Sequence, residues 1–143
     1  MKTAIGRIVL SVCAVGVMLV QFHAEPAPRM AAGDAARGSK LYETLPCASC
    51  HDITKPWPGG AICPNLCNIA SEASRVIRLR EYRGRAKDAA AYIRESIVDP
   101  NAYIVPGPNY RQADGQSVMP KNFGETLTPA QLDDLVAFLL TRR

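Results

Sequence analysis

Histidine and aromatic residues are scarce in this chain, and neither sign of charge is in large excess. Only two of its 143 residues are histidines, His23 and His51, so a site built from several histidine ligands is excluded. Aromatic residues make up 6% and eleven prolines interrupt the sequence, so the chain can build only a modest core by itself. The 17 basic and 13 acidic residues leave a net charge of +4. Without the first 24 residues, which hold two of the basic ones, it falls to +2, too weak to indicate nucleic-acid binding. The hydrophobic content of 48% excludes a disordered protein, and the length is typical of one domain.

Residues 1–24 have the composition of an export signal. Lys2 and Arg7 precede an apolar run of 13 residues, Ile8–Val20, and no acidic residue occurs before Glu25. A run of this length suits a signal peptide better than a full membrane span. Because the basic flank stays in the cytoplasm, the rest of the chain is expected in the periplasm.

Two fates of this leader stay open. Removal after Ala24 would place Phe22 where a small residue is preferred, so an uncleaved membrane anchor over residues 4–22 is the alternative. Cys13 is interpreted as an ordinary leader residue, because Val12 is unsuited to precede a lipidated cysteine. A Pro/Ala-rich linker is expected over residues 25–32, followed by one domain over residues 33–143.

Helical patterns dominate that domain. Asp34 is a good N-cap for a first helix, which Pro46 ends. Further helices are expected over residues 71–79 and 86–98. The last helix has the clearest start, since Thr128, Pro129 and Gln131 form a capping box with proline in the first position.

Long loops separate these predicted helices. Residues 52–61 and 103–123 are rich in Pro and Gly and show no sustained periodicity. We therefore expect an all-α fold of about three to five helices, without strands. A small domain with loops this long usually needs something else in its centre, and a large apolar cofactor would meet that need.

The segment Cys47-Ala48-Ser49-Cys50-His51 has the spacing C-x-x-C-H. Two cysteines three positions apart reach the two vinyl groups on one edge of a haem and form thioethers, and the adjacent histidine is directed onto the iron. This is the attachment signature of a c-type haem. We predict one haem c, bound covalently through Cys47 and Cys50, with His51 as an iron ligand.

Three rival interpretations of these residues are less well supported. A thioredoxin-like C-x-x-C needs a βαβ context, which the sequence does not show. A structural zinc site needs four ligands, so Cys63 or Cys67 would have to complete the set. A simple disulfide between Cys47 and Cys50 is the third interpretation.

The second axial ligand follows from counting. Haem iron takes a sixth ligand or keeps an open face, and His23 lies in the leader, so a second histidine is not available to the domain. Of the two methionines after the leader, Met30 lies in the linker, whereas Met119 precedes a proline that holds it extended. We predict Met119 as the sixth ligand.

The order of these motifs resembles that of a class I cytochrome c. The haem motif is followed by Pro64-Asn65-Leu66, by Val118-Met119-Pro120 and by an amphipathic C-terminal helix, and the similarity covers roughly residues 33–140. The stretches around Met119 and residues 96–100 resemble in particular the monohaem domains of respiratory oxidases and reductases.

The resemblance implies further roles. The Pro64 carbonyl should accept a hydrogen bond from the ring nitrogen of His51 that does not face iron. Gly38 and Tyr42 of the first helix should cross the last helix near Phe138, with the glycine permitting close approach.

Cys63 departs from the family pattern, which usually has glycine there. Cys63 and Cys67 are left over in an oxidising compartment and flank Pro64-Asn65-Leu66. A disulfide between them is the favoured interpretation, and two buried thiols are the alternative.

With His51 and Met119 both on iron, no site remains for a substrate. We therefore expect a single-electron carrier with a positive potential, not an enzyme. Its expected partners are redox proteins (an oxidase, a reductase or a dehydrogenase), which it serves as a shuttle or as a subunit of a larger enzyme. The alternative is a haem protein with an open or displaceable sixth site that binds or reduces peroxide, nitric oxide or carbon monoxide. An apolar shell is expected from Leu41, Leu66, Ile97, Val118 and Phe123.

Basic residues cluster in one short stretch of the chain. This cluster is expected to be a solvated face, a docking patch, or a partner for anionic groups of the cofactor. Its members are Arg75, Arg78, Arg80, Arg83, Arg85 and Lys87.

Overall fold

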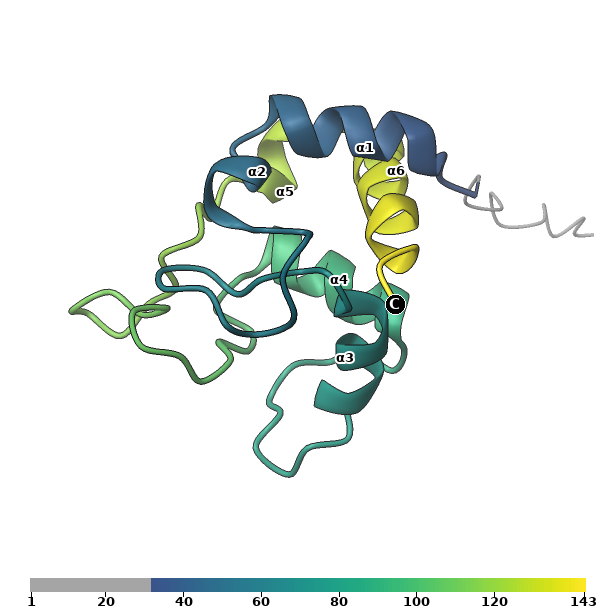
Figure 1. The fold of residues 1–143 in the computed structure, drawn as a ribbon. Coiled ribbons are helices and arrows are strands. Elements are labelled where there is room, and N and C mark those ends of the chain that lie inside the picture. Colours follow the sequence, from purple (N-terminus) through teal and green to yellow (C-terminus); the bar gives the residue numbers. More distant parts are fainter. Residues whose placement is uncertain (1–31) are drawn as a thin grey trace, which may run out of the picture.

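The computed structural model describes residues 32–143 (Figure 1). The predicted leader, Met30 and all of the predicted linker but its last residue lie outside the described residues. No helix in residues 32–143 is long and apolar enough to cross a membrane.

Helices are the regular structure of the described residues, as the sequence predicts. The first two are α1 (Ala35–Thr44) and the single turn α2 (Cys47–Cys50). Next come α3 (Ile69–Val76) and α4 (Ala89–Val98). The last two are the single turn α5 (Phe123–Thr126) and α6 (Pro129–Leu140). Residues 32–143 contain no β-strand; Arg111 and Ser117 form one isolated bridge. The predicted all-α class is confirmed for residues 32–143, but they form six helices instead of the expected three to five, because α2 and α5 add two single turns.

The capping residues explain where the outer helices begin. The Asp34 carboxylate accepts hydrogen bonds from the backbone N–H groups of Ala36 and Arg37, 2.8 and 3.0 Å away. At α6, Thr128 and Gln131 form the predicted capping box. Both starts match the sequence prediction, because the caps are local side chain–backbone bonds.

The inner helices differ from their predicted bounds. α4 begins at Ala89 instead of residue 86, because the Asp88 carboxylate accepts a bond from Ala91 N at 2.8 Å and caps the helix there. α3 occupies residues 69–76 instead of 71–79, and its N-cap Asn68 makes no side-chain cap bond. Asn68 is a residue type typical of an N-cap, but its side-chain oxygen accepts from Trp57 N at 2.8 Å instead, a contact that the local sequence does not reveal.

Helices α1 and α6 cross at Gly38. A Cβ on Gly38 would lie 1.9 Å from the Asp134 carbonyl oxygen and 2.8 Å from Phe138 Cβ. One turn further, the rings of Tyr42 and Phe138 pack with centroids 5.5 Å apart. The predicted crossing is confirmed, and only glycine permits this approach.

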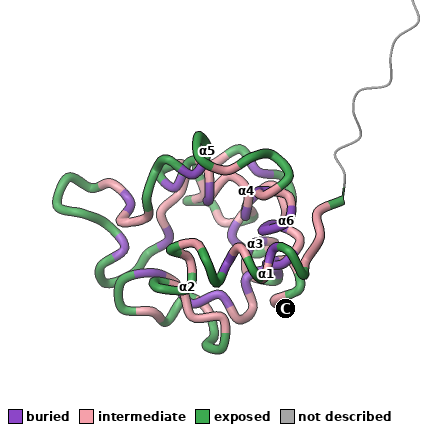
Figure 2. Tube along the Cα trace, turned by 90° about the horizontal axis from the view of Figure 1, so that it is seen from above, coloured by how far each residue is buried: buried purple, intermediate pink, exposed green. Residues whose placement is uncertain are grey.

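Asp134 ties the same crossing together from α6. Its carboxylate accepts bonds from Asp34 N at 2.6 Å and from Arg37 Nε at 2.7 Å. Figure 1 shows α1 lying across the upper end of α6, with α3 and α4 below. Figure 2 shows exposed residues along the outer loops, whereas six of the 12 residues of α6 are buried. The helices therefore form one side of the domain, and the long loops complete the other.

Candidate functional site

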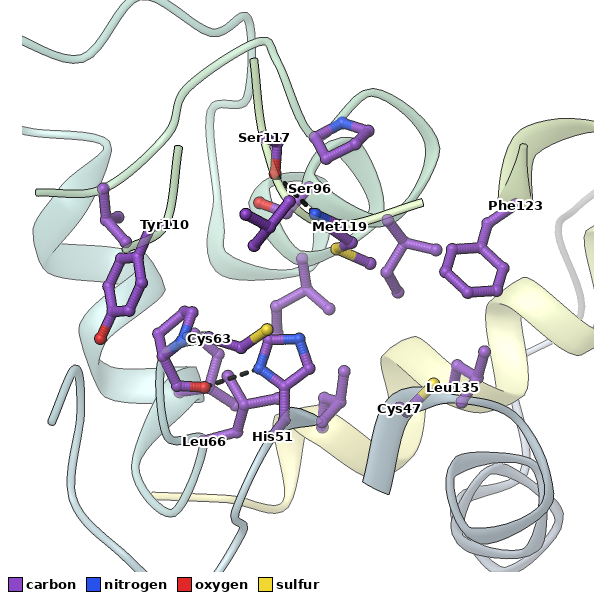
Figure 3. Close-up of a pocket in the computed structure, with 18 of the residues that line it drawn as sticks. Cys47, His51, Cys63, Leu66, Ser96, Tyr110, Ser117, Met119, Phe123 and Leu135 are labelled. Atoms are coloured by element: carbon purple, nitrogen blue, oxygen red, sulfur yellow. Dashed lines mark hydrogen bonds between the residues drawn. The ribbon is translucent and has the colours of Figure 1, made fainter. Parts of the chain in front are cut away.

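An apolar cavity lies between the helices and the two long loops (Figure 3). His51, Cys63 and Leu66 line it from the segment after α2, and Met119 and Phe123 line it from the segment before α6. Its polar lining groups are few, and none of its lining residues is an arginine, a lysine or a carboxylate. Such a cavity suits a large apolar group held by a few directed ligands.

The His51 ring is held by one backbone oxygen. His51 follows α2 directly, and its N–H donates to the Cys47 carbonyl at 2.9 Å. Its ring Nδ1 lies 2.6 Å from the Pro64 carbonyl oxygen. A carbonyl can only accept, so Nδ1 carries the proton and Nε2 keeps its lone pair. Burial lowers the pKa of His51, against the opposing effect of the Pro64 bond, so the ring is a neutral donor.

Tyr42 secures the same residue from α1. Its hydroxyl donates to the His51 carbonyl oxygen. Burial, with smaller contributions from Cys47 and Asp52, raises the pKa of Tyr42 to about 12, so the hydroxyl stays a donor at neutral pH. The backbone of His51 is thereby fixed to the helix pair that forms the core.

The two cysteines of the haem motif differ in exposure. Cys47 is half-buried and lines the cavity, and burial raises the pKa of its thiol. Cys50 is exposed. The single turn of α2 thus presents Cys47 to the cavity, while the exposed Cys50 contacts the Cys63 thiol.

Met119 reaches the cavity from the opposite loop. Its N–H donates to Ser117 Oγ at 3.1 Å, and Ser117 N donates to Asn101 Oδ1 at 2.8 Å. Figure 3 shows Met119 and His51 extending into the cavity from opposite sides. A thioether and an imidazole nitrogen are a donor pair that haem iron accepts, so the lining fits the predicted cofactor.

The predicted apolar shell is present except at one position. The cavity is lined by Leu66, Ile97, Val118 and Phe123. Leu41 packs against the hydrophobic core but does not line the cavity. The reason is helical geometry, since α1 turns the neighbouring side chain, Tyr42, toward the cavity instead.

Sequence reasoning missed several lining residues. Leu135 and Leu139 of α6 line the cavity, and their i,i+4 spacing was a usable sign. Tyr110 had no local sign. Its hydroxyl donates to the carbonyl oxygens of Pro58 and Gly60, both at 2.9 Å, and so joins the two long loops.

The structure does not form the predicted disulfide between Cys63 and Cys67. Both are free thiols. The buried Cys63 side chain points into the cavity, where burial and then contact with Cys50 raise the pKa of its thiol to about 12. Cys67 does not line the cavity. Pairing would therefore need the Cys63 side chain to turn out of the cavity.

The rival interpretations of the haem motif gain no support from the described residues. No three His, Cys, Asp or Glu side chains in residues 32–143 are grouped so that they could hold a metal ion, as a zinc site would require. Nor does this part of the chain contain the βαβ context of a thioredoxin-like motif.

Comparison with known proteins agrees with the site. The sequence model of the family described as cytochrome c matches residues 35–143, most of the chain. No curated protein and no solved structure gives a significant match. Members of this family bind haem c covalently and pass electrons to redox partners. The chain therefore belongs to the cytochrome c family, as a haem-based electron carrier of class I.

Proposed function

We propose that the protein carries single electrons with one haem c, attached through Cys47 and Cys50 and ligated by His51 and Met119. The observation that carries this proposal is the pair of opposed ligands: His51, fixed through Nδ1 to the Pro64 carbonyl at 2.6 Å, and Met119 on the facing loop. When bound, the haem supplies an Fe(III)/Fe(II) couple.

The chain's own groups set the conditions for that couple. A neutral imidazole and a neutral thioether add no charge to the site, and the apolar lining disfavours the more highly charged oxidised state. Both effects raise the potential. The two ligands also leave no position for a substrate, so the protein works as a carrier and not as an enzyme.

Axial ligation is tested by spectroscopy and by carbon monoxide binding. The oxidised protein should show the weak near-infrared absorption of methionine bound to iron, and the reduced protein should not bind carbon monoxide. Met119→Ala should abolish the absorption and permit carbon monoxide binding. Met30→Leu is the matched control and should leave both unchanged. Tight carbon monoxide binding by the unaltered protein, without the near-infrared absorption, would establish the open-site haem protein instead.

The location and the partners form the second part of the proposal. Cytochrome c domains are usually extracytoplasmic, and residues 1–24 have the composition of an export leader. We place the domain in the periplasm, either free after cleavage near Ala24 or anchored through residues 4–22. Electrons then pass to or from an oxidase, a reductase or a dehydrogenase.

Intact mass of the purified native protein separates these two forms. A soluble protein that starts near Glu25 indicates a shuttle, whereas a detergent-requiring protein that starts at Met1 indicates an anchored subunit. The same measurement reports the added mass of one haem and the loss of two hydrogens if Cys63 and Cys67 are paired.

A further inference from the structure

The loop between α3 and α4 concentrates the positive charge of the domain. The segment from Arg75 to Asp88 contains six basic and two acidic residues, a net charge of +4. The rest of residues 32–143 contains eight basic and ten acidic residues, a net charge of −2. The domain therefore has a strongly basic loop on an otherwise slightly acidic body.

Five of the six basic side chains of this stretch face solvent without an acidic partner among the described residues. Arg75 pairs with Glu72, Nε to Oε2 at 2.7 Å. No other basic side chain of the stretch forms an ion pair within the described residues. None of them lines the apolar cavity. The exposed set consists of Arg78, Arg80, Arg83, Arg85 and Lys87.

The loop is nevertheless fixed in place by one carboxylate. Glu95 of α4 accepts a hydrogen bond from Arg85 N at 2.7 Å and another from the Tyr82 hydroxyl. The Tyr82 oxygen accepts in turn from Ala86 N at 3.0 Å. A Cβ on Gly84 would lie 2.1 Å from Glu95 Oε2, so the glycine lets the loop close over this carboxylate. The basic side chains thus project from an ordered backbone.

The apolar residues of the loop turn inward. Ile77, Leu79 and Tyr82 are partly buried and pack against the core, which leaves charged side chains outside. A surface that enters a lipid layer needs exposed apolar residues, and this loop offers none. Five of the six basic residues are arginines, whose planar guanidinium groups match carboxylates in pairs and are enriched in protein interfaces. These features favour a protein surface over a membrane.

The loop also connects to the cavity. Tyr82 packs against Tyr92, with ring centroids 6.0 Å apart, and Tyr92 lines the cavity. Figure 1 shows the loop at the lower end of the molecule, whereas α2, with its two cysteines, lies in the upper part. A partner bound at the loop would leave the α2 end free.

We propose that residues 77–87 form a preorganised docking surface for the carboxylate-rich face of a redox partner. This proposal rests on the proposed function, because it assigns the face through which the electron carrier meets one class of partner. Exposed, mobile charges would be worth little. An ordered loop backbone loses less entropy on binding, and its concentrated positive charge speeds encounter with an oppositely charged surface.

The test uses the haem-loaded protein and poly-L-glutamate as an acidic probe. Binding is followed at low salt through backbone amide chemical shifts. Arg78→Gln/Arg80→Gln/Arg85→Gln should weaken binding at least tenfold. Lys40→Gln/Lys55→Gln/Arg143→Gln has the same change in net charge elsewhere and should weaken binding less than twofold. An equal loss of affinity in the two triple variants would show that binding depends on net charge alone and would overturn the proposal.

A second pair of variants tests preorganisation. Glu95→Gln and Glu95→Ala make the same change in charge, but only glutamine keeps an acceptor oxygen for Arg85 N and an amide group that can donate to the Tyr82 oxygen. Glu95→Ala should bind the probe at least threefold more weakly than Glu95→Gln, although both variants have the same net charge. Equal binding by both variants, with both folded by circular dichroism, would remove the role of Glu95.

Two further outcomes separate the remaining explanations. Tighter binding to phosphatidylglycerol vesicles than to poly-L-glutamate would make the loop a membrane contact and overturn the protein assignment. Amide shifts in residues 77–87 do not depend on the sixth iron ligand. A protein that lacks the near-infrared absorption but binds the probe at this loop would therefore refute the proposed ligation and leave the docking surface standing.

Discussion

The backbone of Gly38 in α1 lies directly against the backbone of Asp134 in α6. A Cβ added to Gly38 would meet the Asp134 carbonyl oxygen at 1.9 Å, and neither helix backbone can yield that distance without moving the whole crossing. We therefore expect Gly38→Ala to lower the free energy of unfolding by about 3 kcal/mol, measured by denaturant titration of the haem-loaded protein.

Gly124→Ala is the matched control for this prediction. Gly124 also lies in a helix, but a Cβ there would meet Val98 Cβ at 3.4 Å, an ordinary contact. This variant should be neutral or stabilised by up to about 1 kcal/mol, since alanine is the better helix former. Similar stability in both variants would show that the crossing is looser than the structure has it.

A second prediction concerns the hydroxyl of Tyr42. Tyr42→Phe keeps the ring against Phe138 but removes the donor to the His51 carbonyl, so it should cost about 1 kcal/mol of unfolding free energy. Tyr103→Phe is the control, because the buried Tyr103 hydroxyl has no hydrogen-bond partner among the described residues. Its removal should be neutral or stabilising. Equal effects of the two changes would contradict the assigned bond.

Buried tyrosines predict a loss of stability in alkali. The pKa values of Tyr42 and Tyr82 are raised to about 12, from the ordinary 10.0, chiefly by burial. A raised pKa means that the folded state binds the proton more tightly, so stability is fully present below pH 10 and falls between pH 10 and 12. Denaturant titrations across this range should show the decline. Tyr42→Phe/Tyr82→Phe should make the decline shallower without removing it, because burial also raises the pKa values of Tyr92, Tyr103 and Tyr110. An unchanged slope in that variant would assign the decline to other groups.

Acid should act through Asp134. Hydrogen bonds from Arg37 and from Asp34 N lower the pKa of this carboxyl below its ordinary 3.8. A lowered pKa means that its contribution is present above about pH 4 and is lost as the pH falls through the folded value. Asp134→Asn should lower the melting temperature at neutral pH and make its acid dependence shallower. Glu43→Gln, an exposed change on α1, should leave the acid dependence as it is.

The sequence predicted those features that depend on few neighbouring residues. Asp34 and Thr128 mark the helix starts because each caps through bonds to residues two or three positions away. The C-x-x-C-H segment predicted the site for the same reason, because all of its reactive side chains lie within five consecutive residues.

Features that depend on the fold were missed. Tyr110 joins two loops about fifty positions apart in the chain, and no local pattern marks such a contact. We expected Leu41 in the cavity lining, but its neighbour Tyr42 points there instead. The sequence does not reveal how the first helix is rotated about its axis, so it could not distinguish these two adjacent positions. Spacing suggested that Cys63 would face Cys67, whereas the loop turns Cys63 inward.

The absence of arginine and lysine from the cavity lining has a consequence for how this protein can change over time. Six of the fourteen basic residues in residues 32–143 lie between Arg75 and Asp88, whereas the side chains that line the cavity are uncharged. Substitutions that alter recognition can therefore accumulate without retuning the redox couple, and substitutions in the lining can retune the couple without altering recognition. Partner recognition and reduction potential can therefore evolve independently in this domain.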